Sequence, residues 1–361
     1  MTLTALYAII KMCYCNHLHT FIREVAFMKK IFKIFAFILI SAAVMALLSC
    51  NSEQPEATEG ATSTDEVTEA TEATEKATKK PKETEPLTKL ENTEGLDLNL
   101  KILSQNVRYA DDDSGTVAQR TTRLRALIDE HQPDLIGTQE VTFEWYMYLR
   151  TLKEYAIVGW SRNGRGESTG EWSAIMYKKD RFVLLDSDTF WLTETPDEVS
   201  MTEGAKCRRI CTWAELFDRY TGETVIMTNT HLDHSTDEVR EIQARYLIEH
   251  LKTRLGEKFE SCAVYLTGDF NCKNTTTPYD AIIEGGFADS RKAALEDLST
   301  VAGSYHGYEN KDREIDFCFF NSDETVLSYE IISKGYAGDD DTEPGYVSDH
   351  YGVLATFKRE G

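Results

Sequence analysis

The sequence predicts an α/β domain built from layers of strands and helices. Short apolar segments with the two-residue alternation of β-strands recur from residue 98 to residue 357, interleaved with amphipathic helical segments. Strands and helices interleaved in this way pack into layers, and the ends of the strands collect at one edge. Most of the predicted strands carry Asn, Asp, Glu or His at one end. We therefore expect a functional site at that edge.

Composition and charge narrow the possible functions. A chain of 361 residues with 41% hydrophobic and 11% aromatic residues can bury a sizeable core. The formal charge is −22, and most of the acidic excess falls in the predicted domain. A domain of this charge repels nucleic acid at long range, and the sequence gives no strong sign of nucleic-acid binding. Phosphate chemistry remains compatible with the charge, because a bound divalent metal supplies local positive charge.

A predicted targeting signal precedes the domain at the amino terminus. Lys29, Lys30 and Lys33 precede an apolar run over residues 34–48, which has the length of a signal-peptide core and is short for a membrane span. The run ends in Leu-Leu-Ser-Cys50 and resembles the bacterial lipoprotein signal, which implies cleavage before Cys50 and a lipid on its thiol. The alternative is a simple signal anchor with an incidental cysteine.

Four segments follow from this pattern. We predict a start-site extension over residues 1–27, a lipoprotein signal peptide over 28–49, a disordered tether over 50–95 and the folded domain over 96–361. The tether is rich in Thr, Glu, Ala and Lys and offers almost nothing to bury, so no packed core offsets the entropy of ordering it. Such a segment would hold the domain away from a membrane surface. We expect a lipid-anchored protein on the extracytoplasmic side of the cell membrane.

The elements of the domain are identified by their periodicity and by the residues that end them. The predicted strands cover residues 98–107, 134–138, 156–159, 173–177, 182–191, 210–217, 224–230, 262–266, 314–319, 325–333 and 351–357. The predicted helices cover residues 116–131, 143–152, 236–255 and 279–284. Pro133 ends the first helix. In the helix over 236–255 we expect Val239, Ile242, Tyr246 and Leu251 to face inward.

Two oxygen-bearing side chains, Asp269 and Asn271, follow the buried strand over residues 262–266. In an extended chain, side chains two residues apart point the same way, so a carboxylate and a carboxamide would emerge side by side. Oxygen ligands of this kind suit Mg²⁺, which usually keeps several waters. The alternative is a loop in which Asp269 and Asn271 make a turn.

Other predicted strands carry polar side chains of the same kind at their ends. They are Asn106 after the first strand, Glu140 after the second, His231 after the strand over 224–230, Asp316 near the start of the strand over 314–319, and Asp349 and His350 before the last strand. Asn106 could contact a metal or a phosphate, or it could be a turn asparagine. Independent turn residues are not expected to repeat at so many strand ends, which favours one shared site.

Two arginines and a glutamate in loops complete the candidate residues. Arg162 lies in a glycine-rich loop that could bind a phosphate or another anion. Glu171 comes shortly before the strand over 173–177 and is a candidate carboxylate of the site. Arg209 directly precedes the strand over 210–217, and we expect it to face the site. Arg162 and Arg209 are therefore the predicted substrate-binding residues.

Six short motifs occur in a fixed order along the domain. They are Gln105-Asn106-Val107-Arg108, Gln139-Glu140-Val141, Thr230-His231-Leu232-Asp233-His234, Gly268-Asp269-Phe270-Asn271, Ile315-Asp316-Phe317 and Ser348-Asp349-His350. In this order they resemble the endonuclease/exonuclease/phosphatase superfamily, which has the deoxyribonuclease I-like fold. The resemblance spans residues 98–357 and implies a four-layer α/β/β/α sandwich, with two mixed sheets face to face and helices outside. The segment over 201–206 departs from relatives, which puts substrate contacts from that loop in doubt.

The resemblance implies a metal-dependent phosphoesterase. Glu140 would be the main Mg²⁺ ligand, helped by Asn106 and Asp349, with Mn²⁺ or Ca²⁺ as alternative ions. Asp269 and Asn271 would position the phosphate and the attacking water, or hold a second metal. The metal would neutralise phosphate charge and polarise the phosphorus.

The resemblance also gives roles to two histidines and a glutamate. His350 would be the general base or a phosphate-stabilising group, oriented by Asp316, because a carboxylate fixes the tautomer of an imidazole and raises its basicity. His231 would hydrogen-bond a non-bridging phosphate oxygen or assist the leaving group. Glu171 would belong to the site and could support a histidine.

Two functions of different classes remain. The first is a membrane-tethered hydrolase of phosphodiesters or phosphomonoesters, which we expect to be a monomer. The alternative is a non-catalytic lipoprotein that binds a ligand or partner through the same fold, and it predicts broken catalytic positions. None of the six motifs is broken, which favours the hydrolase.

Overall fold

The computed structural model describes residues 87–112, 114–309, 311–339 and 341–360. The predicted start-site extension, the signal peptide and most of the tether lie outside the described residues. Nearly all of the predicted domain over 96–361 is included. Within the described ranges, no helix is long and apolar enough to cross a membrane.

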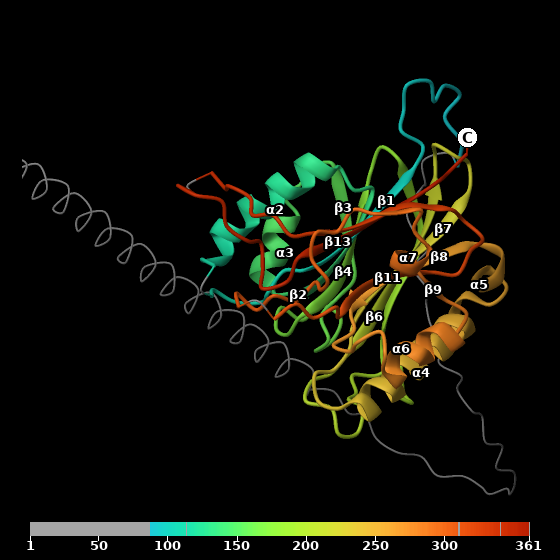
Figure 1. Cartoon of the computed structure of the whole chain (residues 1–361). Helices are drawn as coiled ribbons and strands as arrows, with labels where there is room; N and C mark the ends of the chain where they lie inside the picture. The colour runs from blue at the N-terminus through green and yellow to red at the C-terminus, as the bar shows by residue number, and fades with distance from the viewer. Residues whose placement is uncertain (1–86, 113, 310, 340, 361) are drawn as a thin grey trace, which may run out of the picture. The chain divides into compact units, whose positions relative to one another are not determined.

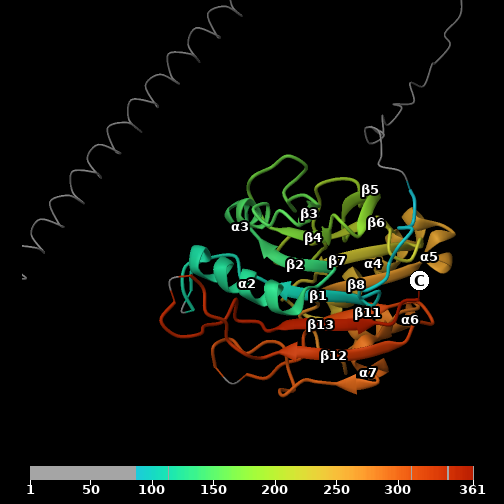
Figure 2. The same cartoon turned by 90° about the horizontal axis from the view of Figure 1, so that it is seen from above.

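A seven-stranded mixed sheet forms one half of the domain. Its strands, in order across the sheet, are β10 (Glu296–Asp297), β12 (Val326–Ile332), β13 (Gly352–Phe357), β1 (Leu100–Asn106), β2 (Leu135–Val141), β4 (Trp172–Lys178) and β3 (Tyr155–Val158). Figure 2 shows β12, β13 and β1 side by side. β1 runs parallel to β2, with Asn106 in register with Gln139, and antiparallel to β13. This register brings Asn106 next to the residue that precedes Glu140.

A six-stranded mixed sheet forms the other half. Its strands, in order, are β5 (Phe182–Trp191), β6 (Ile210–Asp218), β7 (Thr224–His231), β8 (Ala263–Asp269), β11 (Asp316–Phe320) and β9 (Ala288–Asp289). β7 and β8 are parallel, with His231 in register with Asp269. β11 is antiparallel to β8, and its first residue, Asp316, pairs with Asp269. Three predicted site residues thus meet at one end of this sheet.

Helices cover the outer face of each sheet (Figure 1). The helices α2 (Val117–His131) and α3 (Phe143–Leu149) lie on the side of the seven-stranded sheet. The helices α4 (Asp237–Leu255), α5 (Lys258–Ser261) and α6 (Thr277–Glu284) lie on the side of the six-stranded sheet, and the short α7 (Ser290–Ala293) follows β9. The four-layer α/β/β/α sandwich predicted from the sequence is confirmed.

Helix α2 shows how the local sequence sets the limits of an element. Thr116 accepts a hydrogen bond from the backbone amide of Gln119, and the Gln119 side chain accepts one from the Thr116 amide at 3.0 Å. This reciprocal capping box satisfies two amides at the start of the helix. At the other end, Gln132 has a φ of 52°, in the left-handed region, and Pro133 follows. The residue before a proline is disfavoured in the helical region, so the helix ends there.

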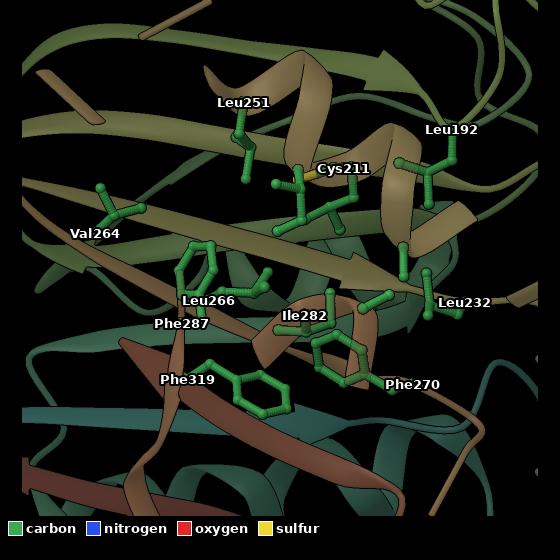
Figure 3. Close-up of a cluster of buried hydrophobic side chains, with 14 of the residues drawn as sticks. Leu192, Cys211, Leu232, Leu251, Val264, Leu266, Phe270, Ile282, Phe287 and Phe319 are labelled. Atoms are coloured by element: carbon green, nitrogen blue, oxygen red, sulfur yellow. The ribbon is translucent and has the colours of Figure 1, made fainter. Parts of the chain in front are cut away.

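Three clusters of buried side chains hold the four layers together. The cluster between the two sheets includes Leu100, Ile102, Val225, Met227 and Tyr265. The cluster under α2 and α3 includes Leu124, Leu127, Ile136 and Trp145. The cluster under α4 and α6, shown in Figure 3, includes Leu251, Leu266, Phe270, Ile282 and Phe319. Burial of this apolar surface is the main favourable contribution to folding.

Most predicted elements agree with the structure to within a few residues, but three details differ. The strand predicted over 262–266 continues to Asp269, and the helix predicted over 143–152 ends at Leu149. The prediction that Ile242 faces inward is wrong, because its side chain is 44% exposed. The neighbouring Gln243 takes the buried position, where it accepts a hydrogen bond from Asp233 N at 2.9 Å. A polar partner thus overrides the hydrophobic pattern at this turn of α4.

Candidate active site

The predicted strand-end residues come together in one cleft. The cleft has a volume of about 810 Å³. Its walls include Glu140, Arg162, Glu171, Arg209, His231, Asp269, Asn271, Asp349 and His350. Asn106 and Asp316 lie directly behind this surface, since each contacts a lining residue and is almost fully buried. The cleft therefore contains or adjoins all of the predicted site residues.

Oxygen atoms from three strands form the centre of the cleft. Asn106 Nδ2 donates to Glu140 Oε1 at 3.1 Å and to Asp269 Oδ2 at 3.0 Å. Glu140 Oε2 accepts a hydrogen bond from Tyr109 N at 3.0 Å. Glu140 has a φ of 59° and lies in a β-bulge between Thr138 and Val141. Such a bulge re-aims a side chain at the edge of a sheet, and here it directs the Glu140 carboxylate toward Asn106.

These residues fit a hard divalent cation. Ligand atoms of Glu140, His231 and Asp269 lie within 4.8 Å of one another. Asp349 also lines the cleft, and its Oδ1 accepts a hydrogen bond from Ser348 Oγ at 3.1 Å. Carboxylate oxygens dominate this donor set, as Mg²⁺ and Mn²⁺ prefer. Glu140, Asn106 and Asp349 remain the predicted metal ligands, with Asp269 within reach.

A second group of ligand atoms, from Cys207, Asp233 and His234, fits a metal less well. Asp233 Oδ1 accepts two backbone amides, and its Oδ2 accepts Cys207 N at 3.0 Å and Arg209 Nε at 3.4 Å. Burial would raise the pKa of Asp233, but the hydrogen bonds and the Arg209 charge outweigh burial and lower the pKa to about 2. Both oxygens of the Asp233 carboxylate are thus used in hydrogen bonds, including those that fix the loop before β6.

Asp269 and Asn271 form a turn and belong to the cleft at the same time. The chain leaves β8 at Asp269, and Asn271 has a φ of 50°, so the extended conformation expected from the sequence does not continue. Asn271 N donates to Asp269 Oδ1 at 2.9 Å, as in an Asx-turn. Both side chains line the cleft. Both alternatives for this segment are therefore correct: Asp269 and Asn271 make a turn, and they also belong to the site.

His231 is positioned by Asn271. The Asn271 amide nitrogen donates to the Leu232 carbonyl at 3.0 Å and lies 3.0 Å from His231 Nε2. The Leu232 carbonyl can only accept a hydrogen bond, so the Asn271 side-chain atom that faces it must be the amide nitrogen and not the oxygen. The second hydrogen of this amide then points to His231 Nε2, which accepts it. Burial and the charges of Arg209 and His350 lower the pKa of His231 well below its usual value. The imidazole is thus neutral, with its proton on Nδ1.

His350 is held by a buried carboxylate. Its Nδ1 lies 2.7 Å from Asp316 Oδ2, which also accepts a hydrogen bond from Ser304 Oγ at 2.7 Å. Its Nε2 faces the cleft, 3.7 Å from Asp269 Oδ2. Burial would lower the pKa of His350, but Asp316 and Asp269 outweigh it and raise the pKa to about 10. Burial and the charge of Asp316 raise the pKa of Asp269 to about 7.

The predicted substrate-binding arginines both reach the cleft, each in an ion pair. Arg162 donates to Glu171 Oε2 at 2.9 Å. Arg209 pairs with Asp233 and lies 3.2 Å from His234 Nδ1. Among the described residues, no hydrogen bond joins Glu171 to a histidine, and its side chain pairs with Arg162 instead.

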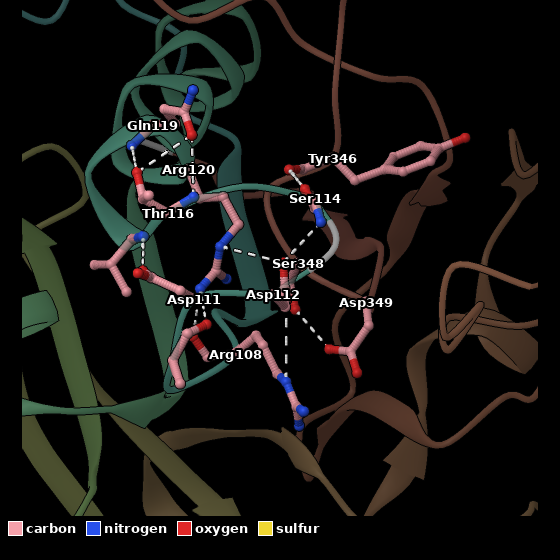
Figure 4. A network of polar contacts seen from close by, with 12 residues as sticks. Arg108, Asp111, Asp112, Ser114, Thr116, Gln119, Arg120, Tyr346, Ser348 and Asp349 are labelled. Carbon is pink, nitrogen blue, oxygen red and sulfur yellow. Dashed lines mark hydrogen bonds and ion pairs between the residues drawn. The ribbon is translucent and has the colours of Figure 1, made fainter.

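Arg120, which the sequence analysis missed, fixes the loops that carry the site. Its fully buried guanidinium donates to the carbonyls of Val107 at 2.6 Å, Arg108 at 3.2 Å and Val347 at 3.2 Å. Figure 4 shows Arg120 beside the segments that follow β1 and precede β13. These segments carry Asn106 at one side and Asp349 at the other. The available signal was an arginine on the apolar face of α2, between Val117 and Leu124.

A polar contact between the two sheets, also missed, lies behind the cleft. Asn229 of β7 is fully buried and donates to the carbonyls of Thr138 and Ala174 in the other sheet, at 2.9 Å each. Gln139 Nε2 donates to Asn229 Oδ1 at 2.7 Å. A Cβ atom at Gly137 would lie 2.0 Å from Thr267 Oγ1, so the sheets approach too closely there for any larger residue. The signal was an asparagine on the face of β7 that otherwise carries Val225 and Met227.

The fold and the cleft define a class of protein: two-sheet α/β sandwiches with an acid–histidine centre at one edge of the sheets. The chain belongs to the Endonuclease/Exonuclease/phosphatase family, whose sequence profile matches residues 103–350. The resemblance drawn from the six motifs is therefore confirmed. Members of this family are hydrolases that act on phosphoester bonds, and they generally use divalent metals.

Solved structures of bacterial proteins are similar over the whole domain. An endonuclease/exonuclease/phosphatase from Bacteroides vulgatus is 32% identical, with a TM-score of 0.65, and the match covers 73% of this chain and 100% of that one. The mannosyl-6-phosphatase Bt3783 of Bacteroides thetaiotaomicron is 28% identical, with a TM-score of 0.66, over 72% of this chain and 100% of that one. D. rerio TDP2 in complex with a single-strand DNA product is 20% identical, with a TM-score of 0.54, over 73% and 100%, and shows the fold alone. No curated protein sequence matches the chain.

Proposed function

We propose that the protein is a metal-dependent phosphoesterase anchored by lipid to the outer face of the cell membrane. The main observation in favour of a hydrolase is that Glu140, Asp269 and the His350–Asp316 pair converge at one cleft. Oxygen ligands for a cation and an oriented imidazole are the two requirements for attack of water on a phosphate ester. The family and the phosphatase neighbour support the same reaction.

Glu140, Asn106 and Asp349 would hold the metal, with Mg²⁺ as the first choice and Mn²⁺ or Ca²⁺ as alternatives. The ion would neutralise charge on the phosphate and make the phosphorus more electrophilic. Asp269 would position the attacking water, because its carboxylate lies 3.5 Å from His231 and 3.7 Å from His350.

The two histidines have different surroundings and would do different work. His350 is oriented by Asp316 through its Nδ1, so its Nε2 is the atom presented to the reaction, as a base toward water or as a donor to a phosphate oxygen. His231 is neutral and held by Asn271, and it would contact a non-bridging oxygen or the leaving group. Arg162 and Arg209 would contact the substrate from the adjoining wall of the cleft.

The substrate proposed is a phosphomonoester. The neighbour Bt3783, which is 28% identical, is a mannosyl-6-phosphatase, and this supports a small phosphorylated sugar as the substrate. The charge of −22 argues against a nucleic-acid duplex, since no basic stripe compensates it. The membrane location rests on Cys50 and the apolar run before it, and the monomeric state remains an expectation.

The proposal is tested with the full-length chain, purified in detergent. Release of product from p-nitrophenyl phosphate, bis-p-nitrophenyl phosphate, mannose 6-phosphate and plasmid DNA is compared with Mg²⁺ and with EDTA, and His350→Ala is the control. Metal-dependent turnover that His350→Ala abolishes is the expected result. Absence of turnover on all four substrates, with Mg²⁺, Mn²⁺ or Ca²⁺, would favour the non-catalytic binding protein instead.

A further inference from the structure

One wall of the cleft is built from ion pairs. Arg162 pairs with Glu171 at 2.9 Å, Arg209 pairs with Asp233 at 3.4 Å, and Arg240 pairs with Asp237 at 2.6 Å. Each of these three arginines is thus matched by a carboxylate, whereas Arg208, which borders the same cavity as Arg162 and Glu171, donates to Asn163 Oδ1 at 3.3 Å. The three pairs offer many hydrogen-bonding groups and place a carboxylate beside each of their arginines, unlike a cluster of unpaired arginines that would hold a second phosphate.

The Arg162–Glu171 pair adjoins the predicted reaction centre. Both side chains are 19% exposed, and both border the cavity that Glu140 and His231 also line. Burial raises the pKa of Glu171, with Arg162 opposing the effect. Glu140 lines the same cavity as the pair, and its charge also raises the pKa of Glu171.

The pair is held rigidly by its backbone. Arg162 N donates to the Glu171 carbonyl at 2.9 Å, and the indole of Trp191 donates to the Arg162 carbonyl at 2.8 Å. Ser161 bridges to Trp172 on one side and to Gly164 on the other. The two charged side chains therefore extend from a fixed platform, and binding a ligand there costs little ordering of the chain.

The pair also leaves hydrogen-bonding capacity on both partners. Among the described residues, the side-chain hydrogen bonds of the pair use one guanidinium nitrogen of Arg162 and one carboxylate oxygen of Glu171. A guanidinium only donates and a carboxylate only accepts, whereas a hydroxyl group does both. A donor and an acceptor side by side match a hydroxyl, or two neighbouring hydroxyls. Glu171 would repel an anionic group at the same place.

We propose that the Arg162–Glu171 pair binds hydroxyl groups of the leaving alcohol, so that the substrate is a phosphate ester of a neutral polyol such as a sugar. The inference rests on the proposed phosphoesterase function and specifies its substrate class. A substrate with a second phosphate near the scissile one would meet Glu171 and bind less well.

The test compares two esters that share the scissile phosphate and differ in the leaving group. Mannose 6-phosphate offers hydroxyl groups to the pair, whereas p-nitrophenyl phosphate offers none. For Glu171→Ala in the full-length protein, kcat/KM for mannose 6-phosphate is expected to fall by about 10- to 100-fold. The fall for p-nitrophenyl phosphate is expected to be much smaller, because its leaving group makes no hydrogen bond with the pair, so the ratio of the two values falls.

The design separates binding of the alcohol from loss of folded enzyme. The ratio of the two kcat/KM values does not depend on how much of a preparation is active, so a partly unfolded Glu171→Ala still gives an answer. Glu171→Gln, which keeps an acceptor oxygen, should give a smaller change in the ratio. Glu241→Ala, which removes the glutamate of the Arg245–Glu241 pair on α4, should leave the ratio unchanged.

Each other outcome overturns the inference. An equal fall for both esters would make Glu171 a structural or catalytic group. A wild-type preference for fructose 1,6-bisphosphate over mannose 6-phosphate would mean that the wall binds a second anion. If wild-type protein hydrolyses p-nitrophenyl phosphate, the proposed phosphoesterase function stands whatever the ratio shows; if it hydrolyses no ester, both proposals fail.

Discussion

Gln139 Nε2 lies 2.7 Å from Asn229 Oδ1, and this hydrogen bond joins the two sheets of the sandwich. Gln139 directly precedes Glu140, and Asn229 stands two residues before His231. The contact that holds the sheets together therefore also sets the spacing between a predicted metal ligand and a histidine of the cleft.

Loss of this contact should destabilise the fold. Asn229→Ala removes a buried partner of the Gln139 amide and of the carbonyls of Thr138 and Ala174. The Gln139 amide keeps its contact with Ser104 Oγ, and the Ala174 carbonyl keeps that with Thr138 Oγ1. Because unpaired buried polar groups are costly, we expect the free energy of unfolding to fall by about 2–4 kcal/mol. Urea denaturation followed by circular dichroism measures this. Asn92→Ala, at an exposed position, is the control and should change stability by less than about 0.5 kcal/mol.

Arg120 should be irreplaceable by lysine. An ammonium group carries the same charge but cannot reach the carbonyls of Val107, Arg108 and Val347 in one planar fork. We expect Arg120→Lys to lower the free energy of unfolding by about 2–4 kcal/mol. The matched control is Arg125→Lys on the solvent side of α2, where the side chain is 45% exposed. Equal stability of the two variants would show that the carbonyl contacts contribute nothing.

Glu140 should be needed for binding of the metal even without substrate. A ligand that binds only the folded state raises the melting temperature in proportion to the logarithm of its concentration. We expect millimolar Mg²⁺ to raise the Tm of the wild-type protein and to leave that of Glu140→Gln unchanged. Glu144→Gln, an exposed position on α3, should respond like the wild type. A full Mg²⁺ shift in Glu140→Gln would place the ion elsewhere.

Asp233 should make stability depend on pH in the acid range. Its pKa is lowered to about 2 in the folded protein, below the value of about 3.9 for an unfolded chain. The stabilisation is therefore present above about pH 4 and is lost as the pH falls toward 2. We expect Asp233→Asn to be less stable than the wild type by about 1–2 kcal/mol at pH 7, with the difference closing at low pH.

Urea titrations at pH 7, 4 and 2.5 measure this dependence. Asp129→Asn, an exposed change on α2, controls for the loss of one surface charge. A difference between Asp233→Asn and the wild type that stays constant from pH 7 to pH 2.5 would contradict the assignment.

Much of the fold could be predicted from the sequence, because alternation and helical periodicity survive in single segments. The strand predicted over residues 182–191 matches β5 residue for residue, and the strand-end motifs indicated the edge where the cleft lies. The inward face of α4 was predicted less well. There Gln243 is buried through its hydrogen bonds to Asp233 and Thr202, and contacts with distant residues leave no trace in local periodicity.

The site could be predicted as a set of residues but not as a set of contacts. Glu171 pairs with Arg162, and Asn271 orients His231. These contacts depend on the directions of side chains in loops, where the backbone can be left-handed, as it is at Asn271. The supporting polar residues Arg120 and Asn229 were missed because their partners are mostly backbone carbonyls, which every residue carries. A polar side chain on an apolar face was the only local signal.

The proposed reaction is the hydrolysis of phosphate esters in the cleft, with Asp269 positioning the attacking water. The most direct measurement is the release of inorganic phosphate from mannose 6-phosphate by the full-length wild-type protein and by Asp269→Asn, each with Mg²⁺ and with EDTA. We predict turnover by the wild type with Mg²⁺, its loss with EDTA, and a rate at least about 100-fold lower for Asp269→Asn. Equal rates for the two proteins, or turnover that EDTA leaves unchanged, would contradict the account.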